Sequence, residues 1–283
     1  MRFVTFEQDS ERQPGVVLHD QIVSLKPAGF ADMLAVLQGG DAALERIDRF
    51  LAAQPAGTPA ATAKLCAPIP APPKILCMGL NYRDHAEEAH LEIPKYPVFF
   101  AKYDNTVIGS GDHIVIPKNT RKPDYEAEFG FVIGKRARHI KADQWRDYVF
   151  GYMNCNDVSA RDFQMSVSQW TMGKNFDTFG PMGPWLVSAE EIEDPHNLNV
   201  MLTVNGETMQ SSNTRELIFK IPETVEFLSS VMTLEPGDVI FTGTPAGVGF
   251  GRKPPRWLKP GDEVVVSVEG LGELRNVCVA EEE

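Results

Sequence analysis

Beyond residue 70, the chain consists of short apolar segments separated by turns such as "NGE", "EPGD" and "KPGD". Segments of this length, bounded by glycine, proline and asparagine, fit strands better than helices. The main exception is a helix predicted from Pro222, with Val225, Leu228 and Val231 facing inward. We therefore predict a mostly β fold of the α+β class, with sheets folded into a sandwich or barrel-like roll. The predicted strands are "KILCMGL", "PVFFAKY", "DHIVIP", "YEAEFGFVIG", "VFGYMNCND", "GPWLVS", "NVMLTVNGE", "DVIFTG", "DEVVVSVEG" and "GELRNVCVA".

The first 70 residues read as a separate small α/β unit. Short strands are predicted for "RFVTFE" and "PGVVLHDQIVSL", and apolar residues at helical spacing from Phe30 to Leu37 predict a helix that ends at Gly39. The stretch "APIPAPPK" that follows this unit is an extended, stiff connector because it is rich in proline. We therefore predict a small N-terminal domain over 1–70 and a larger β-roll domain over 71–283.

Composition argues against several classes of protein. The formal net charge of −12 disfavours nucleic acid as a partner, because phosphate binding needs a basic face. No apolar run approaches the length of a membrane span, and "MRFVTFEQDSERQ" contains no apolar signal core. The four cysteines are scattered, without the spacing of a zinc site or a disulfide framework. We therefore expect a cytoplasmic protein that binds neither nucleic acid nor a membrane.

The segment "DYEAEFGFVIG" places two glutamates, Glu126 and Glu128, on one face of a strand. A second predicted strand ends in Asp157, which can meet the two glutamates if the strands are neighbours. Three carboxylates form a hard, all-oxygen site that suits Mg²⁺, Mn²⁺ or Ca²⁺, and an octahedral ion then keeps about three positions for water and substrate. The alternative is an acidic strand face that arginine or lysine side chains neutralise across the sheet.

The segment "NYRDHAEEAH" contains a candidate proton-transfer pair. His85 and Glu88 are three residues apart, so one turn of helix places them on the same face. A carboxylate can orient a histidine and stabilise its protonated form, which lets the histidine take a proton from water. The alternative is a surface helix in which His85 merely lies near acidic residues.

Two glycine-rich segments complete the set of candidates. Lys174 lies in "TMGKNFDTFGPMGPW", where an ammonium group can neutralise a developing enolate or pair with Asp177 instead. The segment "GDVIFTGTPAGVGFG" lacks the Gly-Lys-Ser/Thr of a phosphate-binding loop and does not open a helix. Its turn at Gly243 and Thr244 can hold a small carboxylate through backbone N–H groups and the threonine hydroxyl, or it is a plain glycine turn.

Taken together and in this order, these elements resemble the fumarylacetoacetate hydrolase (FAH) superfamily. The similarity covers about residues 73–280 and rests on "GLNYRDHAEE", "DYEAEFGFVIGK", "NDVSARDFQ", "GKNFDTFGPMGP", "NTRELIF" and "LEPGDVIFTGTPAGVG". The resemblance implies an FAH-like mixed β-sandwich roll after a small N-terminal unit, and a homodimer formed through the larger domain.

The resemblance also implies a set of site residues. A divalent cation, Mg²⁺ or Mn²⁺ with Ca²⁺ as a further candidate, would be bound by Glu126, Glu128 and Asp157. The remaining catalytic residues implied are His85 and Glu88, which activate water, and Lys174, which lies near the reacting centre. The residues implied to contact the substrate are Tyr82, Arg161, Gln164, Gly243 and Thr244.

These assignments lead us to expect metal-dependent hydrolysis of a C–C bond in a β-diketo acid such as an acylpyruvate. His85, oriented by Glu88, would take a proton from water, and the metal with Lys174 would stabilise the enolate that leaves. One alternative is decarboxylation of a β-keto acid such as oxaloacetate, which needs no attacking water. Isomerase or hydratase activity on related keto acids is another, and a non-catalytic protein that binds metal and keto acid is a third.

Overall fold

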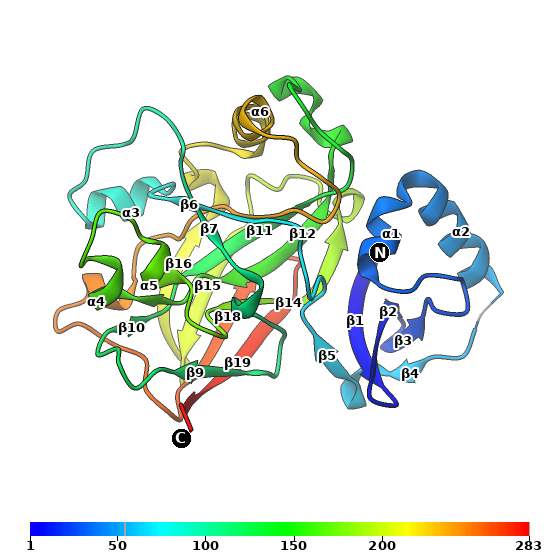
Figure 1. The fold of residues 1–283 in the computed structure, drawn as a ribbon, viewed down its shortest axis with the longest axis horizontal. Helices are drawn as coiled ribbons and strands as arrows, with labels where there is room; N and C mark the ends of the chain where they lie inside the picture. The colour runs from blue at the N-terminus through cyan, green and yellow to red at the C-terminus, as the bar shows by residue number, and fades with distance from the viewer. Residues whose placement is uncertain (54, 283) are drawn as a thin grey trace.

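The computed structural model describes residues 1–53 and 55–282. Its largest sheet has the strand order β4-β3-β2-β1-β14-β12-β11-β17-β6-β7, with β5 paired to β1 and β8 paired to β14 (Figure 1). These strands are β1 (Arg2–Gln8), β2 (Glu11–Leu18), β3 (Gln21–Ser24), β4 (Thr58–Pro59), β5 (Lys64–Cys66), β6 (Ile75–Gly79), β7 (Val98–Lys102), β8 (Val107–Ile108), β11 (Ala127–Ile133), β12 (Val149–Asn156), β14 (Gly180–Ser188) and β17 (Val239–Phe241).

A second sheet of five strands packs against this one in the order β16-β15-β18-β19-β9. Strands β15 and β19 of this sheet alternate buried and more exposed residues, as expected where one face is solvated, whereas every residue of β11 is buried. Asn154 of β12 joins the sheets, since its amide donates to the Leu271 carbonyl and accepts from the Val268 N–H. The remaining strands are β9 (His113–Ile116), β10 (Pro123–Asp124), β13 (Ser159–Ala160), β15 (Asn199–Val204), β16 (Glu207–Asn213), β18 (Glu263–Val268) and β19 (Glu273–Ala280), of which β10 and β13 form a two-stranded sheet of their own.

The helices are short and lie outside the sheets (Figure 1). The predicted helix near Pro222 is α6, which buries Val225 and Leu228 in the core; Val231, expected to face inward, is 59% exposed because it ends the helix. The α-helices are α1 (Met33–Gln38), α2 (Gly40–Ala52), α3 (Arg83–Glu88), α4 (Arg161–Gln164), α5 (Thr171–Lys174) and α6 (Ile221–Val231). The 3₁₀ turns are η1 (Ala60–Thr62), η2 (Asp104–Thr106), η3 (Ala142–Asp147), η4 (Ala189–Glu191), η5 (Thr214–Glu216) and η6 (Gly249–Gly251).

Strand residues outnumber helix residues, and two packed sheets form the larger part, so the predicted mostly β fold of the α+β class is confirmed. No helix in the described ranges combines the length and apolar character needed to cross a bilayer.

The N-terminal unit, drawn in blue in Figure 1, continues the large sheet. Strand β1 pairs antiparallel with β14, with Arg2 opposite Val187 and Phe3 opposite Leu186. The apolar cluster that contains Phe3 also contains Met153 of β12. The two units therefore share backbone hydrogen bonds and a core, and the division at residue 70 stays a prediction.

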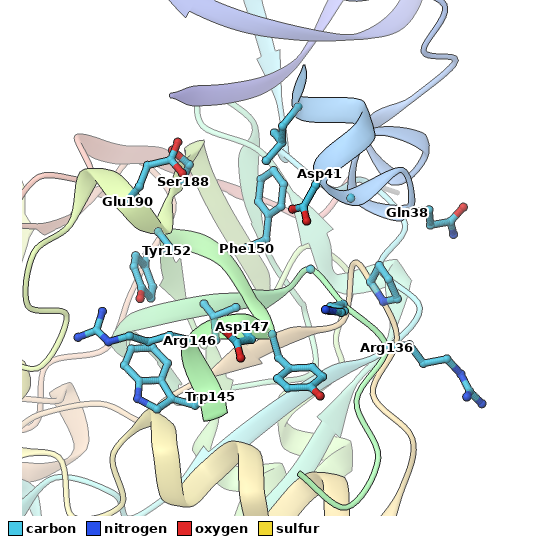
Figure 2. Close-up of a pocket in the computed structure, with 18 residues that line it drawn as sticks. Gln38, Asp41, Arg136, Trp145, Arg146, Asp147, Phe150, Tyr152, Ser188 and Glu190 are labelled. Carbon is cyan, nitrogen blue, oxygen red and sulfur yellow. The ribbon is translucent and has the colours of Figure 1, made fainter. Parts of the chain in front are cut away.

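A cavity of about 710 Å³ lies where α2 approaches the β11–β12 hairpin. Figure 2 shows Asp41 beside Phe150 at one side of it, and Arg146, Asp147 and Tyr152 further away. The cavity lies beside the first residues of β12, roughly 23 Å of strand from that strand's last residue at about 3.3 Å per residue.

Candidate metal and active site

The hairpin of β11 and β12 brings the three predicted metal ligands together. The strands pair antiparallel, with Glu128 opposite Cys155, and the N–H of Asp157 donates to the Glu126 carbonyl at 3.0 Å. Glu126, Glu128 and Asp157 are all buried, and one carboxylate oxygen from each lies within 4.8 Å of the others. The prediction that the two strands are neighbours and that these carboxylates meet is confirmed.

Lysine and arginine side chains surround two of the three carboxylates. Lys174 Nζ lies 2.9 Å from Glu126 Oε2 and 2.6 Å from Asp157 Oδ2. Arg161 Nη1 lies 2.6 Å from Glu126 Oε1, and Lys102 Nζ lies 2.7 Å from Asp157 Oδ1. Each carboxylate oxygen of Glu126 and Asp157 therefore has a cation beside it, so the neutralised face considered as an alternative is present as well.

The ion pairs shift the pKa values of Glu126 and Lys174 in favour of their charged forms. Burial alone raises the pKa of Glu126, but Lys174 and Arg161 outweigh it and lower that pKa to about 2. Burial likewise lowers the pKa of Lys174, but Asp157 and Glu126 outweigh it and raise that pKa above its usual value. The ammonium group of Lys174 and the carboxylate of Glu126 therefore remain charged at neutral pH.

Glu128 differs from its two neighbours because no cation pairs with it. Its Oε2 accepts from the Gly243 N–H at 2.6 Å, and its Oε1 is buried without a hydrogen-bond partner among the described residues. Burial, with the negative charges of Asp157 and Glu126, raises the pKa of Glu128 well above its usual value. An unpartnered oxygen of this kind is costly unless a ligand satisfies it.

The charge balance of the buried cluster fits a divalent cation. Its carboxylates are Asp124, Glu126, Glu128 and Asp157, and its cations are Lys102, Arg161 and Lys174, so the cluster carries one formal net negative charge when Glu128 is ionised. All the candidate ligand atoms are carboxylate oxygens, which Mg²⁺, Mn²⁺ and Ca²⁺ prefer. The free Glu128 Oε1, the acidic excess and the oxygen donor set all suit such an ion.

Helix α3 presents the predicted proton-transfer pair. His85 Nδ1 lies 3.4 Å from Glu88 Oε2, and the Gly247 N–H donates to the Glu88 carboxylate at 3.0 and 3.1 Å. Burial raises the pKa of Glu88, but the hydrogen bonds from His85 and Gly247 outweigh it and lower that pKa. His85 also contributes to the lowered pKa of Glu126. A carboxylate on Nδ1 leaves Nε2 free to exchange protons.

The glycine turn after β17 reaches the site through the Gly243 N–H, which donates to Glu128. Gly243 has φ +95°, and a Cβ there would lie 2.9 Å from the Asn81 Cβ, so a larger residue does not fit. Thr244 Oγ1 accepts from Gln210 Nε2 at 2.8 Å, which fixes the turn against β16. The Gly243 N–H therefore points at Glu128 rather than into open solvent.

The other predicted substrate contacts are buried near the cluster. Arg161 donates to Asp124 Oδ2 through Nε and to Gln164 Oε1 through Nη1, at 2.8 and 2.9 Å. Arg161 Nη2 and the Tyr82 hydroxyl are buried and have no partner in the part of the chain that the structure describes. Two donors thus remain for a ligand, while the Gln164 carbonyl oxygen already accepts from Arg161.

The sequence did not reveal the structural roles of Asp124 and Lys102. Asp124 of β10 accepts from Arg161 and from the N–H groups of Gly249 and Phe250, so it connects η6 to the segment that leads into β11. Lys102 ends an otherwise apolar strand, "VFFAK". A lone lysine in such a strand is a usable signal, because lysine is almost never fully buried unless it is paired.

These features define a buried carboxylate cluster within a β-roll, with oxygen atoms of the kind that divalent cations prefer. The family description "Fumarylacetoacetate (FAA) hydrolase C-terminal" matches residues 74–279, and the chain belongs to this family. The resemblance drawn from the sequence motifs is therefore confirmed.

Individual relatives carry different names. The chain is 43% identical over 287 aligned residues to "Oxaloacetate tautomerase Fahd2a, mitochondrial" of Rattus norvegicus, covering 99% of this chain and 92% of the relative. A solved structure of maleylpyruvate hydrolase from Sphingobium sp. SYK-6, in complex with manganese (II) ion and pyruvate, has 30% identity, a TM-score of 0.86 and full coverage of both chains. A 5-carboxymethyl-2-hydroxymuconate delta-isomerase from Mycobacterium smegmatis has 33% identity, a TM-score of 0.81 and the same coverage.

The expected cytoplasmic location is wrong by this comparison, since the similar tautomerases of rat, cattle and human are all named mitochondrial. The physical reason is that free, buried cysteines are compatible with any reducing compartment and do not single out the cytoplasm.

Proposed function

We propose that the protein is a divalent-metal-dependent enzyme that interconverts the enol and keto forms of a 2-oxo acid of the oxaloacetate type. The observation that carries the proposal is a proton-transfer pair, His85 and Glu88, beside a buried carboxylate cluster with one oxygen free. The identity of 43% to an oxaloacetate tautomerase over nearly the whole chain supports this choice of reaction over hydrolysis.

Glu126, Glu128 and Asp157 would hold Mg²⁺ or Mn²⁺, with Ca²⁺ as a further candidate, and the bound ion would bind the substrate's oxygen atoms and draw negative charge toward them. The ammonium group of Lys174 lies against the same carboxylates and stabilises negative charge on the substrate oxygen. The Arg161 Nη2 and Tyr82 hydroxyl donors are free to orient the substrate's carboxylate.

The reaction moves one proton off the enol oxygen and places one on the neighbouring carbon. His85 Nε2 can accept or deliver such a proton because Glu88 fixes the ring through Nδ1. Glu88 is itself fixed by the Gly247 N–H, so the imidazole is held in one orientation. No water molecule needs to attack, which distinguishes this reaction from hydrolysis.

The second candidate function is hydrolytic C–C cleavage of an acylpyruvate. The structural relative named maleylpyruvate hydrolase, in complex with manganese (II) ion and pyruvate, favours it. The same His85 nitrogen can take a proton from water instead of from an enol. The two reactions use one site, and the substrate decides between them.

The test measures three reactions of metal-stripped protein, with and without Mn²⁺ or Mg²⁺: enol-to-keto conversion of oxaloacetate, loss of CO₂ from oxaloacetate, and cleavage of acetylpyruvate. We expect the metal to restore enol-to-keto conversion far more than the other two. Faster cleavage of acetylpyruvate would make the protein a hydrolase, and faster release of CO₂ would make it a decarboxylase. Metal binding without any turnover would favour the non-catalytic binding protein. The proposed homodimer is checked separately by light scattering in solution.

A further inference from the structure

Lys102 is a buried lysine whose position suggests a part in this site other than substrate contact. It is the last residue of β7, and none of its side chain is exposed. Its Nζ donates to Asp157 Oδ1 at 2.7 Å, to the Val158 carbonyl at 3.4 Å and to the Lys174 carbonyl. An ammonium group has three protons, so these three acceptors saturate it. Lys102 therefore has no donor left for a substrate.

The acceptors of Lys102 belong to two separate parts of the site. Asp157 and Val158 follow β12, whereas Lys174 ends α5. The Lys102 ammonium group thus holds both the carboxylate of Asp157, a candidate metal ligand, and the backbone carbonyl of Lys174. The ammonium group of Lys174 in turn contacts the same Asp157 carboxylate. Loss of the Lys102 ammonium group would free both at once.

The neighbours of Lys102 on β7 are bound to the same end of α5. The Asn175 side chain donates to the Ala101 carbonyl at 3.0 Å and accepts from the Tyr103 N–H at 2.6 Å. The residues on both sides of Lys102 are therefore fixed to Asn175, directly after Lys174. This independent set of contacts connects β7 to the end of α5 on both sides of Lys102.

We propose that Lys102 is a positioning residue that orients Asp157 and Lys174 for metal binding and enolate stabilisation. The inference rests on the proposed metal site formed by Glu126, Glu128 and Asp157. Partners that orient metal ligands in this way typically contribute about 10–100-fold to metal affinity or activity.

The experiment compares Lys102→Met with Lys74→Met, each in the full-length protein. Lys74 is the matched control because its Nζ lies 2.7 Å from Asp238, which is also fully buried, but outside the carboxylate cluster. Mn²⁺ affinity is measured by titration calorimetry, and kcat and KM are measured at saturating Mn²⁺. For Lys102→Met we expect Mn²⁺ affinity about 10–100-fold weaker and kcat reduced with KM nearly unchanged. For Lys74→Met we expect unfolding to become easier but Mn²⁺ affinity to remain within about twofold of wild type.

Unchanged Mn²⁺ affinity in a folded Lys102→Met protein would overturn the proposal, as would an equal loss in both variants or a rise in KM alone. If Lys102→Met does not fold, Lys102→Gln replaces it, because the amide removes the charge but keeps two N–H donors. Mn²⁺ binding by Lys102→Gln as tight as wild type would also reject the role. Failure of the wild-type protein to bind Mn²⁺ would instead reject the metal site itself, so the two failures are distinguishable.

Discussion

Charged side chains lie near both ends of β12, but they are exposed to solvent at one end and buried at the other. Just before its first residue, Arg146 and Asp147 of η3 line an open cavity of about 710 Å³, where water can solvate them (Figure 2). At its last residues, charged groups are buried against one another with one carboxylate oxygen left over. Buried charge is tolerated only when it is paired, so the unpaired charge, rather than the cavity, marks the chemical site.

The largest effect expected from this contrast is that of Asp157→Asn. The substitution leaves Lys102 buried beside a neutral amide and leaves Lys174 with Glu126 alone, and removing one member of a buried ion pair costs about 3–5 kcal/mol. We expect both the free energy of unfolding and the turnover to collapse, measured by chemical denaturation and by the tautomerase assay. A stable, active Asp157→Asn protein would contradict the cluster as described.

Glu128→Gln separates activity from stability. Glu128 has no cation partner, so a neutral amide removes a ligand and relieves repulsion from Asp157 and Glu126 without leaving a cation alone. We expect a loss of about a hundredfold or more in metal-dependent turnover, with a free energy of unfolding equal to or above that of wild type. The control is Glu190→Gln, which changes a carboxylate at the cavity end. Equal activity in both variants would remove Glu128 from the site.

His85→Gln should spare the metal and impair proton transfer. The ring contacts Glu88 and not the carboxylates that would hold the ion, so Mn²⁺ affinity should stay near that of wild type. Proton transfer by a positioned histidine typically contributes about 10²–10⁴-fold, which is the expected loss of enol-to-keto conversion. Retained conversion with lost acetylpyruvate cleavage would assign His85 to hydrolysis alone.

The Glu88 carboxylate should give a small, pH-dependent contribution to stability. Its pKa is lowered in the folded protein, so its contribution is present above the unfolded value of 4.5 and is lost as pH falls through the lower folded value. Because the group is partly exposed, we expect less than about 1 kcal/mol. Unfolding of wild type and Glu88→Gln across this range measures it; a difference that grows as pH falls would have the wrong sign.

Arg146→Ala should have the smallest effect. This side chain lies over the Trp145 ring at the cavity, far along β12 from the carboxylates. Surface substitutions of this kind usually change stability by no more than about 0.5 kcal/mol. Turnover and Mn²⁺ affinity should match wild type, and a marked loss of either would show that the two ends of the strand are coupled.

The sequence predicted those parts of the site that depend on local geometry. Alternation along a strand placed Glu126 and Glu128 on one face, and helical spacing placed His85 near Glu88; both relations hold. The cations could not be predicted in the same way. Lys102 meets Asp157 from 55 positions away, and no periodicity encodes such a contact.

The end of α6 shows another limit. The helical period predicted that Val231 faces inward. Val231 is instead the last residue of α6, where the chain becomes extended at Met232, and its side chain is exposed. Similarly, the sequence showed a proline-rich connector but not that β1 would pair with β14 across it. Pairing between distant strands is decided by tertiary packing, which a single sequence pattern does not contain.

The saturated ammonium of Lys102 also has a chemical consequence. Acylation and reductive methylation both require a free amine lone pair that a reagent can reach. Lys102 is fully covered, and Lys174 is nearly so, with both ammonium groups held by carboxylates. Reagents and acyl donors that modify the exposed lysines of this protein should therefore leave these two intact, and the enzyme should survive surface lysine modification with its centre unaltered.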